Sequence, residues 1–251
     1  MKHLFRIVLL AVILVPSFLH SGSASAQLFI NPIGGTTLAT AGDDFSVGPR
    51  SLGFTGTFFG SSQTNVFVNS NGNLTFGSGD TTFTNSSFPN ASSPRIAPFF
   101  DDLFLPPGSI VENTGTGYYA ATWNGVGTFG AGGAVTAQAA LFGSGNTLGF
   151  QNGDILFSYG LVTSASDNSV TVGLNSGNGT TSAVLPGFSG SGGILNDVQA
   201  RALNNTRWLF HPINGSTYNV SLYTGVPEPG LFALIPAVAL GFGAVYRRRR
   251  K

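Results

Sequence analysis

The stretch from residue 65 to residue 76 constrains the fold more than any other part of the chain. Two short runs, 66–68 and 74–76, alternate apolar side chains with a period of two, the spacing of a strand with one buried face. Asn71 and Gly72, which lie between the runs, tolerate the positive φ angles that a tight hairpin turn requires. The pattern therefore predicts an antiparallel β-hairpin.

A segment interrupted by prolines follows the hairpin. Pro89, Pro94 and Pro98 precede the run Phe-Phe-Asp-Asp at 99–102. Because proline has no backbone N–H to donate to a sheet, we expect an extended crossover that carries the two phenylalanines toward the core. The wider stretch 77–116 is rich in Ser, Asn, Gly and Pro and is predicted to form surface loops.

Composition extends this prediction to the whole chain. Glycine accounts for 36 of the 251 residues, and charged residues for only 8%, against roughly 25% in typical soluble domains. Short apolar or alternating runs recur between glycine-rich turns, without a helical period, at 28–30, 51–59, 118–123, 135–142, 154–159, 169–174 and 206–210. Such a series predicts an all-β fold, an antiparallel β-sandwich.

The N-terminus has the pattern of a secretory signal peptide over residues 1–26. A basic start around Arg6 precedes an apolar stretch at 7–15, and Ala24-Ser25-Ala26 provides the small residues of a cleavage site. We therefore expect cleavage after Ala26. The chain has no cysteine, which excludes a disulfide framework and a thiolate metal site but not export.

The C-terminus, 226–251, combines three features in a fixed order. Pro227-Glu228-Pro229 precedes an apolar run at 231–246. As a helix, that run would be about 24 Å long at ~1.5 Å per residue. It is predicted to be a transmembrane helix whose terminal arginines reach the membrane interface. The chain then ends on five cations, which favour a cytoplasmic position for this end: Arg247, Arg248, Arg249, Arg250 and Lys251.

This combination resembles the PEP-CTERM sorting signal. The resemblance implies recognition by an exosortase-type membrane protease in a Gram-negative bacterium, followed by removal of the tail. An ordinary tail anchor is the alternative. The region between the two terminal segments, 27–225, is called the body below.

The body resembles a second known family, the NIDO domain, an extracellular module first described in nidogen and found in adhesive proteins. Acidic, aromatic and hairpin motifs carry the resemblance, in this order: Asp43-Asp44, Phe58-Phe59-Gly60, Val68 to Phe76, Ile96 to Asp102, Trp123, Gln138, Leu141-Phe142, Asp154 to Tyr159 and Val172 to Leu174. They cover roughly residues 30–180. The resemblance implies an extracellular β-module.

Charge argues against nucleic acid as a partner. The body contains four arginines and nine acidic residues, a net charge of −5, although the whole chain has +1. An acidic body with few arginines does not provide the cations that neutralise phosphates.

The body offers few groups for catalysis. Its single histidine, His211, stands beside Pro212 and is expected to be a solvated turn residue, and no G-x-S-x-G motif accompanies it. Asp101 and Asp102 are adjacent, so on a strand their side chains would point to opposite faces and could not act together on one glycosidic bond. We therefore expect a protein that is not an enzyme. A glycoside hydrolase with dispersed carboxylates is an alternative.

Two further binding roles follow from residue type. Calcium could be held by oxygen ligands from Asp43, Asp44, Asp80, Asp101 and Asp102, although no EF-hand spacing is present and turn-forming roles are the favoured explanation of these residues. The aromatic residues Tyr118, Tyr119 and Trp123 could stack on sugar rings, as in a carbohydrate-binding module, but strand spacing favours core packing.

Taken with the two resemblances, these features predict an exported protein of the cell surface or extracellular matrix. Its expected role is structural or adhesive, in an exopolysaccharide or biofilm matrix. Expected partners are the exosortase-type protease, the membrane through the C-terminal helix, and matrix polysaccharide or protein.

Overall fold

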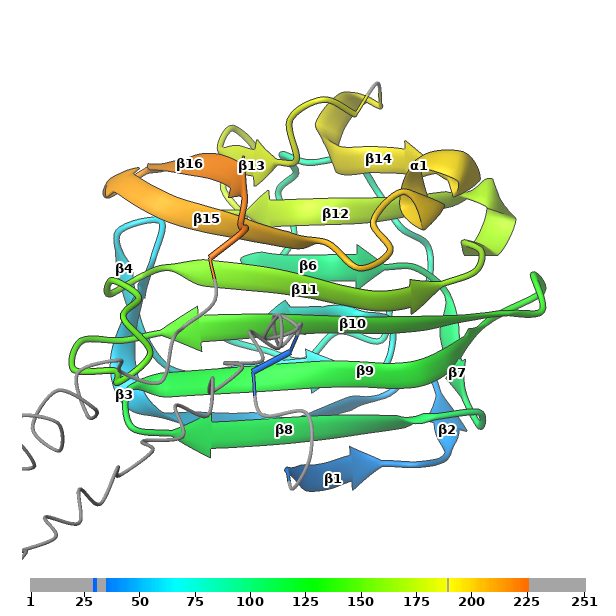
Figure 1. The fold of residues 1–251 in the computed structure, drawn as a ribbon, viewed down its shortest axis with the longest axis horizontal. Coiled ribbons are helices and arrows are strands. Elements are labelled where there is room, and N and C mark those ends of the chain that lie inside the picture. Colours follow the sequence, from blue (N-terminus) through cyan, green and yellow to red (C-terminus); the bar gives the residue numbers. More distant parts are fainter. Residues whose placement is uncertain (1–28, 31–34, 189, 226–251) are drawn as a thin grey trace, which may run out of the picture.

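The computed structural model describes residues 29–30, 35–188 and 190–225. These residues form two antiparallel sheets packed face to face, as expected for a β-sandwich (Figure 1). In order across sheet A lie β1 (Thr36–Ala39), β8 (Ser109–Gly115), β9 (Tyr118–Thr128), β10 (Gly133–Phe142), β11 (Ile155–Val162), β15 (Arg207–Asn214) and β16 (Thr217–Leu222), and β2 (Gly42–Asp43) and β7 (Leu103–Leu105) pair at one end. In order across sheet B lie β13 (Ser182–Val184), β12 (Ser169–Asn175), β6 (Arg95–Phe100), β5 (Asn73–Thr75), β4 (Ser61–Asn69) and β3 (Ser46–Phe58), and β14 (Ile194–Asn196) pairs with β12.

Helix is confined to short turns in the described ranges. They are η1 (Ser166–Asn168), η2 (Ser191–Gly193) and α1 (Asp197–Arg201). None of these helices has the length and apolar character needed to cross a bilayer. The predicted transmembrane segment 231–246 and the predicted signal peptide 1–26 lie outside the described residues.

The predicted hairpin is confirmed as β4–β5. Asn69 faces Asn73 in the register, and Gly72 has a φ of +71° at the turn. The turn also packs against the next strand, because the backbone N–H of Phe99 donates to the carbonyl of Gly72 at 3.2 Å. A Cβ added at Gly72 would lie 1.7 Å from the carbonyl oxygen of Phe99, so only glycine fits this contact.

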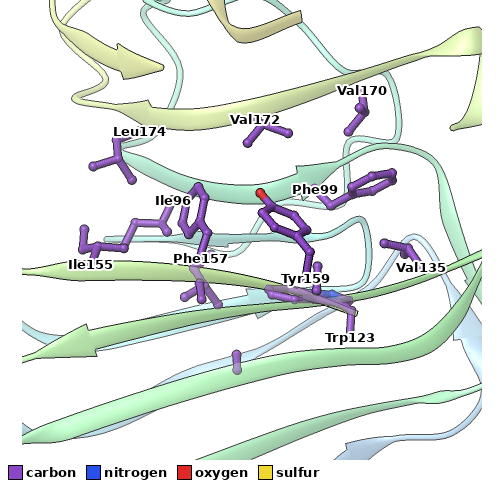
Figure 2. Packing of buried hydrophobic residues seen from close by; sticks show 14 of the residues in the cluster. Ile96, Phe99, Trp123, Val135, Ile155, Phe157, Tyr159, Val170, Val172 and Leu174 are labelled. Atoms are coloured by element: carbon purple, nitrogen blue, oxygen red, sulfur yellow. The ribbon is translucent and has the colours of Figure 1, made fainter. Parts of the chain in front are cut away.

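The core lies between the two sheets (Figure 2). Core-facing residues of β6 and β12, among them Phe99 and Val172, face alternate residues of β9, β10 and β11. Trp123, Phe157 and Tyr159 are fully buried there. This alternation is the period-2 pattern that the sequence contains in 118–123, 135–142 and 154–159.

The prediction that the proline segment is a crossover was wrong at its end. Residues 95–100 form β6, a strand inside sheet B with β12 on one side and β5 on the other. The sheet tolerates Pro98 because the register with β12 shifts between the Gly173 and Thr171 pairs, so no ladder N–H is required there. The carbonyl of Pro98 instead accepts a hydrogen bond of 2.7 Å from the hydroxyl of Tyr159. Two more strands, β7 and β8, lie in the stretch that was expected to be loops.

The outer face of sheet A is also partly buried. Ala120, Ala140, Phe142 and Leu156 form an apolar cluster on that face, and Ile30 and Tyr223 pack against it from opposite ends of the described chain. We call this the outer cluster. The first and last parts of the described chain thus meet the same face of the sandwich.

A buried glutamine secures the N-terminal segment on this face. Ile30 donates its N–H to Oε1 of Gln138 at 2.9 Å, and Nε2 of Gln138 donates to the carbonyl of Ile30 at 3.1 Å. The prediction of a strand at 28–30 was therefore wrong for Phe29 and Ile30, which form a bend; Ile30 is bound by a side chain instead of a neighbouring strand. In Figure 1 they are the short blue segment in front of β9 and β10.

Candidate cation site

Three carboxylates from distant parts of the chain meet at one end of the sandwich. Side-chain oxygens of Asp43, Asp44 and Asp102 all lie within 4.8 Å of one another. Asp43 belongs to β2, which pairs with β7, and Asp102 lies in the turn between β6 and β7. The pairing of β2 with β7 therefore brings these acids together across 58 intervening positions. We call the three residues the acidic cluster.

Asn71 of the hairpin turn organises the acidic cluster. Its side chain is fully buried. Its Nδ2 donates to Oδ1 of Asp44 at 2.8 Å, and its Oδ1 accepts the backbone N–H of Leu103 at 3.0 Å. One amide thus joins the segment after β2 to the start of β7. Sequence reasoning assigned Asn71 only a turn role, since the Asn-Gly signal explained its presence.

The charges of the acidic cluster repel one another. Partial burial raises the pKa of Asp102, and the neighbouring carboxylates of Asp43 and Asp44 raise it further. The pKa of Asp43 is also raised, first by partial burial and then by Asp44. Both shifts mean that ionising these groups has a free-energy cost that a bound cation would reduce.

Asp101 does not join its neighbour. It is buried, its Oδ2 accepts the backbone N–H of Ser166 at 2.6 Å, and its Oδ1 accepts that of Asp102 at 3.0 Å. Burial raises its pKa to about 8. Of the two adjacent carboxylates predicted as weak metal candidates, the structure places Asp102 in the acidic cluster and gives Asp101 a structural role.

Asp80 was wrongly included among the calcium candidates. Its Oδ2 forms an ion pair with Nη2 of Arg95, whose side chain is only 4% exposed. The guanidinium also lies over the ring of Phe100, 4.3 Å from its centroid. Asp80 is therefore the counter-ion of a buried arginine and is not available to the acidic cluster.

The acidic cluster can offer only oxygen ligands. Hard cations such as Ca²⁺ prefer such ligands and bind six to eight of them at about 2.3–2.6 Å. Three carboxylates provide part of this number, and water or carbonyl oxygens would have to complete it. All three residues of the acidic cluster are aspartates, and none is a histidine. A site for a softer transition metal is therefore disfavoured.

The aromatic residues considered for sugar binding are mostly in the core. Trp123 is fully buried and its Nε1 donates to the carbonyl of Asn69 at 3.0 Å. Tyr119 is equally buried, and its hydroxyl donates to Glu112 at 3.1 Å. Tyr118 is half-buried and packs beside the outer cluster. Sugar stacking on Trp123 or Tyr119 is therefore ruled out by their burial.

The expectation for His211 was wrong. It lies on β15 instead of in a turn, and its Nδ1 is 2.7 Å from Oδ1 of Asp154. Asp154 is buried and its other oxygen accepts the N–H of Gln151 at 2.8 Å. The two residues precede and follow the register pair Ile155–Phe210, which explains why they meet across the strands. The contacts described for this pair include no serine hydroxyl, so they do not amount to a catalytic triad.

The remaining predicted site residues cannot be placed. Ala24 and Ala26 of the predicted cleavage site lie outside the described residues, as do the sorting residues: Pro227, Glu228, Pro229, Arg247, Arg248, Arg249 and Arg250.

The chain was compared with known protein families, with curated proteins and with solved structures. A family model described as NIDO related matches residues 21–219. The match extends beyond the expected limit near residue 180, through β15 and into β16. No curated protein and no solved structure matches the chain.

Proposed function

Since the chain belongs to the NIDO-related family, we propose that it is an exported structural or adhesive protein of the cell surface or extracellular matrix. A signal peptide at 1–26 directs it across the inner membrane. The segment 226–251 then holds it there as a precursor until an exosortase-type protease acts at Pro227-Glu228-Pro229. The mature body is released or attached in an exopolysaccharide matrix.

The position of the last strand is the observation that carries this proposal. β16 ends at Leu222, and Tyr223 packs on the outer cluster, so the described fold reaches its end four residues before Pro227. A protease could therefore cut at or beyond this point without removing a strand from either sheet. The two prolines also disfavour continuation of a strand or helix through the site, which keeps it extended.

The architecture of the body supports binding more than chemistry. The largest aromatic side chains fill the space between the sheets, and Asp101, one of the candidate catalytic carboxylates, is buried and bonded to backbone N–H groups. The hydrolase alternative, which needs a carboxylate that reaches substrate, gains no support from this arrangement.

The sorting step is tested in a host that has the protease. Pro227, Glu228 and Pro229 are replaced together by alanine. The matched control replaces the three residues before the motif, Thr224, Gly225 and Val226. This replacement leaves the motif itself intact. We expect the first variant to stay in the membrane fraction with a folded body and the control to be released like the wild type.

Release of both variants at the wild-type rate would contradict the sorting role and leave segment 231–246 as a plain anchor. Mass spectrometry of the released protein supplies a second measurement. It should begin at Gln27 and lack the cationic C-terminus; an exported protein that retains Arg6 would refute the predicted signal peptide.

A further inference from the structure

Four turns from both sheets enclose a hollow at the end of the sandwich opposite the acidic cluster. They are the β3–β4 turn, the segment before β6, the β12–β13 loop and the β15–β16 turn, which approach one another at the left of Figure 1. The hollow encloses about 520 Å³, part of it open to solvent. β6 begins at this end and finishes beside Asp101, so the two sites are about 20 Å apart at ~3.3 Å per residue.

We infer that this hollow binds a segment of a neutral glycan. Its lining contains aromatic rings, hydroxyl groups and side-chain amides, and none of the lining residues is ionisable. Hydroxyl and amide groups can both donate and accept hydrogen bonds, as an uncharged polyhydroxylated ligand requires. An aromatic ring with an exposed part can cover the apolar face of a sugar. Ligand sites commonly combine a concave shape with a few such polar groups.

Phe59 is held in an unfavourable conformation at the rim of the hollow. It forms the turn between β3 and β4 together with Gly60, and the two residues have φ angles of +45° and +79°. Such turns favour Asn, Asp or Gly at both positions, so a phenylalanine here is strained. The ring packs edge-on against Tyr218 at 5.0 Å and remains half-buried. A strained aromatic residue at the rim of a hollow indicates a role beyond making the turn.

Two polar side chains beside Phe59 are free to bind a ligand. Within the described part of the chain, neither the amide of Gln63 nor the hydroxyl of Ser61 has a hydrogen-bond partner. Asn178 on the facing loop behaves differently, because its Oδ1 already accepts the N–H groups of Thr180 and Thr181 at 2.8 and 2.9 Å. Asn178 therefore shapes the wall, while Gln63 and Ser61 offer unused donors and acceptors.

The turns around the hollow fit closely against one another. A Cβ added at Gly60 would lie 2.6 Å from the carbonyl oxygen of Gly215, and one added at Gly177 would lie 2.6 Å from that of Ser92. The first contact joins turns of sheets B and A, and the second joins the β12–β13 loop to the segment before β6. The hollow is thus formed before a ligand arrives, which lowers the entropic cost of binding.

The inference deepens the proposed matrix role, on which it rests, by naming the class of polymer that the body would hold. It is tested on purified protein with a printed array of neutral and uronic-acid oligosaccharides, followed by calorimetry on the neutral oligosaccharide that binds best. Sorting plays no part in this measurement, so failure here and failure of the sorting test can be told apart.

Three variants locate the binding. Phe59→Gly removes the ring and relieves the strained turn, so the fold should be retained, and Gln63→Ala removes the free amide. Phe129→Ala is the control, because its ring is 53% exposed and lies near Asp102 at the other end. We expect wild type and control to bind alike, and each hollow variant to bind at least about tenfold more weakly, or ~1.4 kcal/mol.

Three results would overturn the inference. They are the absence of binding to any neutral oligosaccharide, a preference for the uronic-acid oligosaccharides, and unchanged affinity in Phe59→Gly and Gln63→Ala. Circular dichroism of each variant ensures that lost binding is not lost folding.

Discussion

The contact between the hairpin turn and β6 predicts a large difference between two chemically identical substitutions. Gly72 and Gly77 both have positive φ angles, +71° and +86°. A Cβ at Gly72 would lie 1.7 Å from the carbonyl oxygen of Phe99, whereas a Cβ at Gly77 would have no atom within 4 Å. Gly72→Ala and Gly77→Ala therefore share the backbone strain and differ in the clash.

The magnitude follows from adding these contributions. Alanine in the left-handed region costs about 1–2 kcal/mol, and this is the whole cost expected at Gly77. At Gly72 the clash is with backbone that cannot rotate away, which adds about 1–3 kcal/mol for overpacking. Moving β6 away also weakens the hydrogen bond from Phe99 to Gly72, worth about 0.5–1.5 kcal/mol. We expect Gly72→Ala to be destabilised by about 3–6 kcal/mol.

Urea unfolding followed by tryptophan fluorescence measures both variants. Trp123 donates to the carbonyl of Asn69 in the same hairpin and should report its loss directly. The free energy of unfolding should fall by about 2–4 kcal/mol more for Gly72→Ala than for Gly77→Ala. Equal losses would refute the argument that close approach, rather than backbone conformation alone, requires glycine at this turn.

Three further predictions concern the buried and clustered charges. Asp80→Ala leaves the guanidinium of Arg95 buried without its counter-ion, so the free energy of unfolding should fall by about 3–5 kcal/mol. A smaller loss in the double variant Asp80→Ala/Arg95→Met would support the unpaired buried charge as the cause, and an equal loss would oppose it. The pKa of Asp101 is raised to about 8 in the fold, so its contribution favours folding at low pH and is lost as the pH rises from about 4 to about 8, by up to ~1.4 kcal/mol per pH unit. The difference in unfolding free energy between wild type and Asp101→Asn should therefore change with pH over this range. A difference that stays constant would count against this prediction. Asp102→Asn should relieve repulsion in the acidic cluster and raise the melting temperature in the presence of chelator. It should also reduce the increase in melting temperature that Ca²⁺ causes in the wild type. Identical responses of the two proteins to Ca²⁺ would rule out the cluster as a cation site.

Local patterns in the sequence were sufficient to predict the hairpin and much of the core. The alternation in 66–68 and 74–76, with Asn71-Gly72 between the two runs, contains both the strand period and the turn chemistry, and β4–β5 followed from them. Trp123 was expected in the core for the same reason and is there. These features depend on neighbours within a few residues, which a sequence displays directly.

Features that depend on distant partners could not be predicted in this way. Pro98 argued against an interior strand, and only the register shift opposite it on β12 makes β6 acceptable. His211 has its partner Asp154 57 positions away, and the acidic cluster requires β2 to pair with β7. Asp80 offered the same chemistry as Asp102, but its carboxylate is the counter-ion of Arg95, which lies 15 positions away in the sequence.

The outer cluster has a consequence for how the proposed precursor would be oriented. Ile30 is 15 residues from the end of the apolar stretch 7–15, and Tyr223 is eight residues from Leu231. An extended chain of at most ~3.6 Å per residue would therefore allow about 54 Å and 29 Å to the two predicted membrane segments. In the proposed precursor, with both segments in the bilayer, both connections would therefore leave from the same face of the sandwich. We propose that the outer face of sheet A would then be the face nearer the lipid and sheet B the face farther from it. In that arrangement both ends of the sandwich, with the acidic cluster at one and the hollow at the other, would remain open to a ligand.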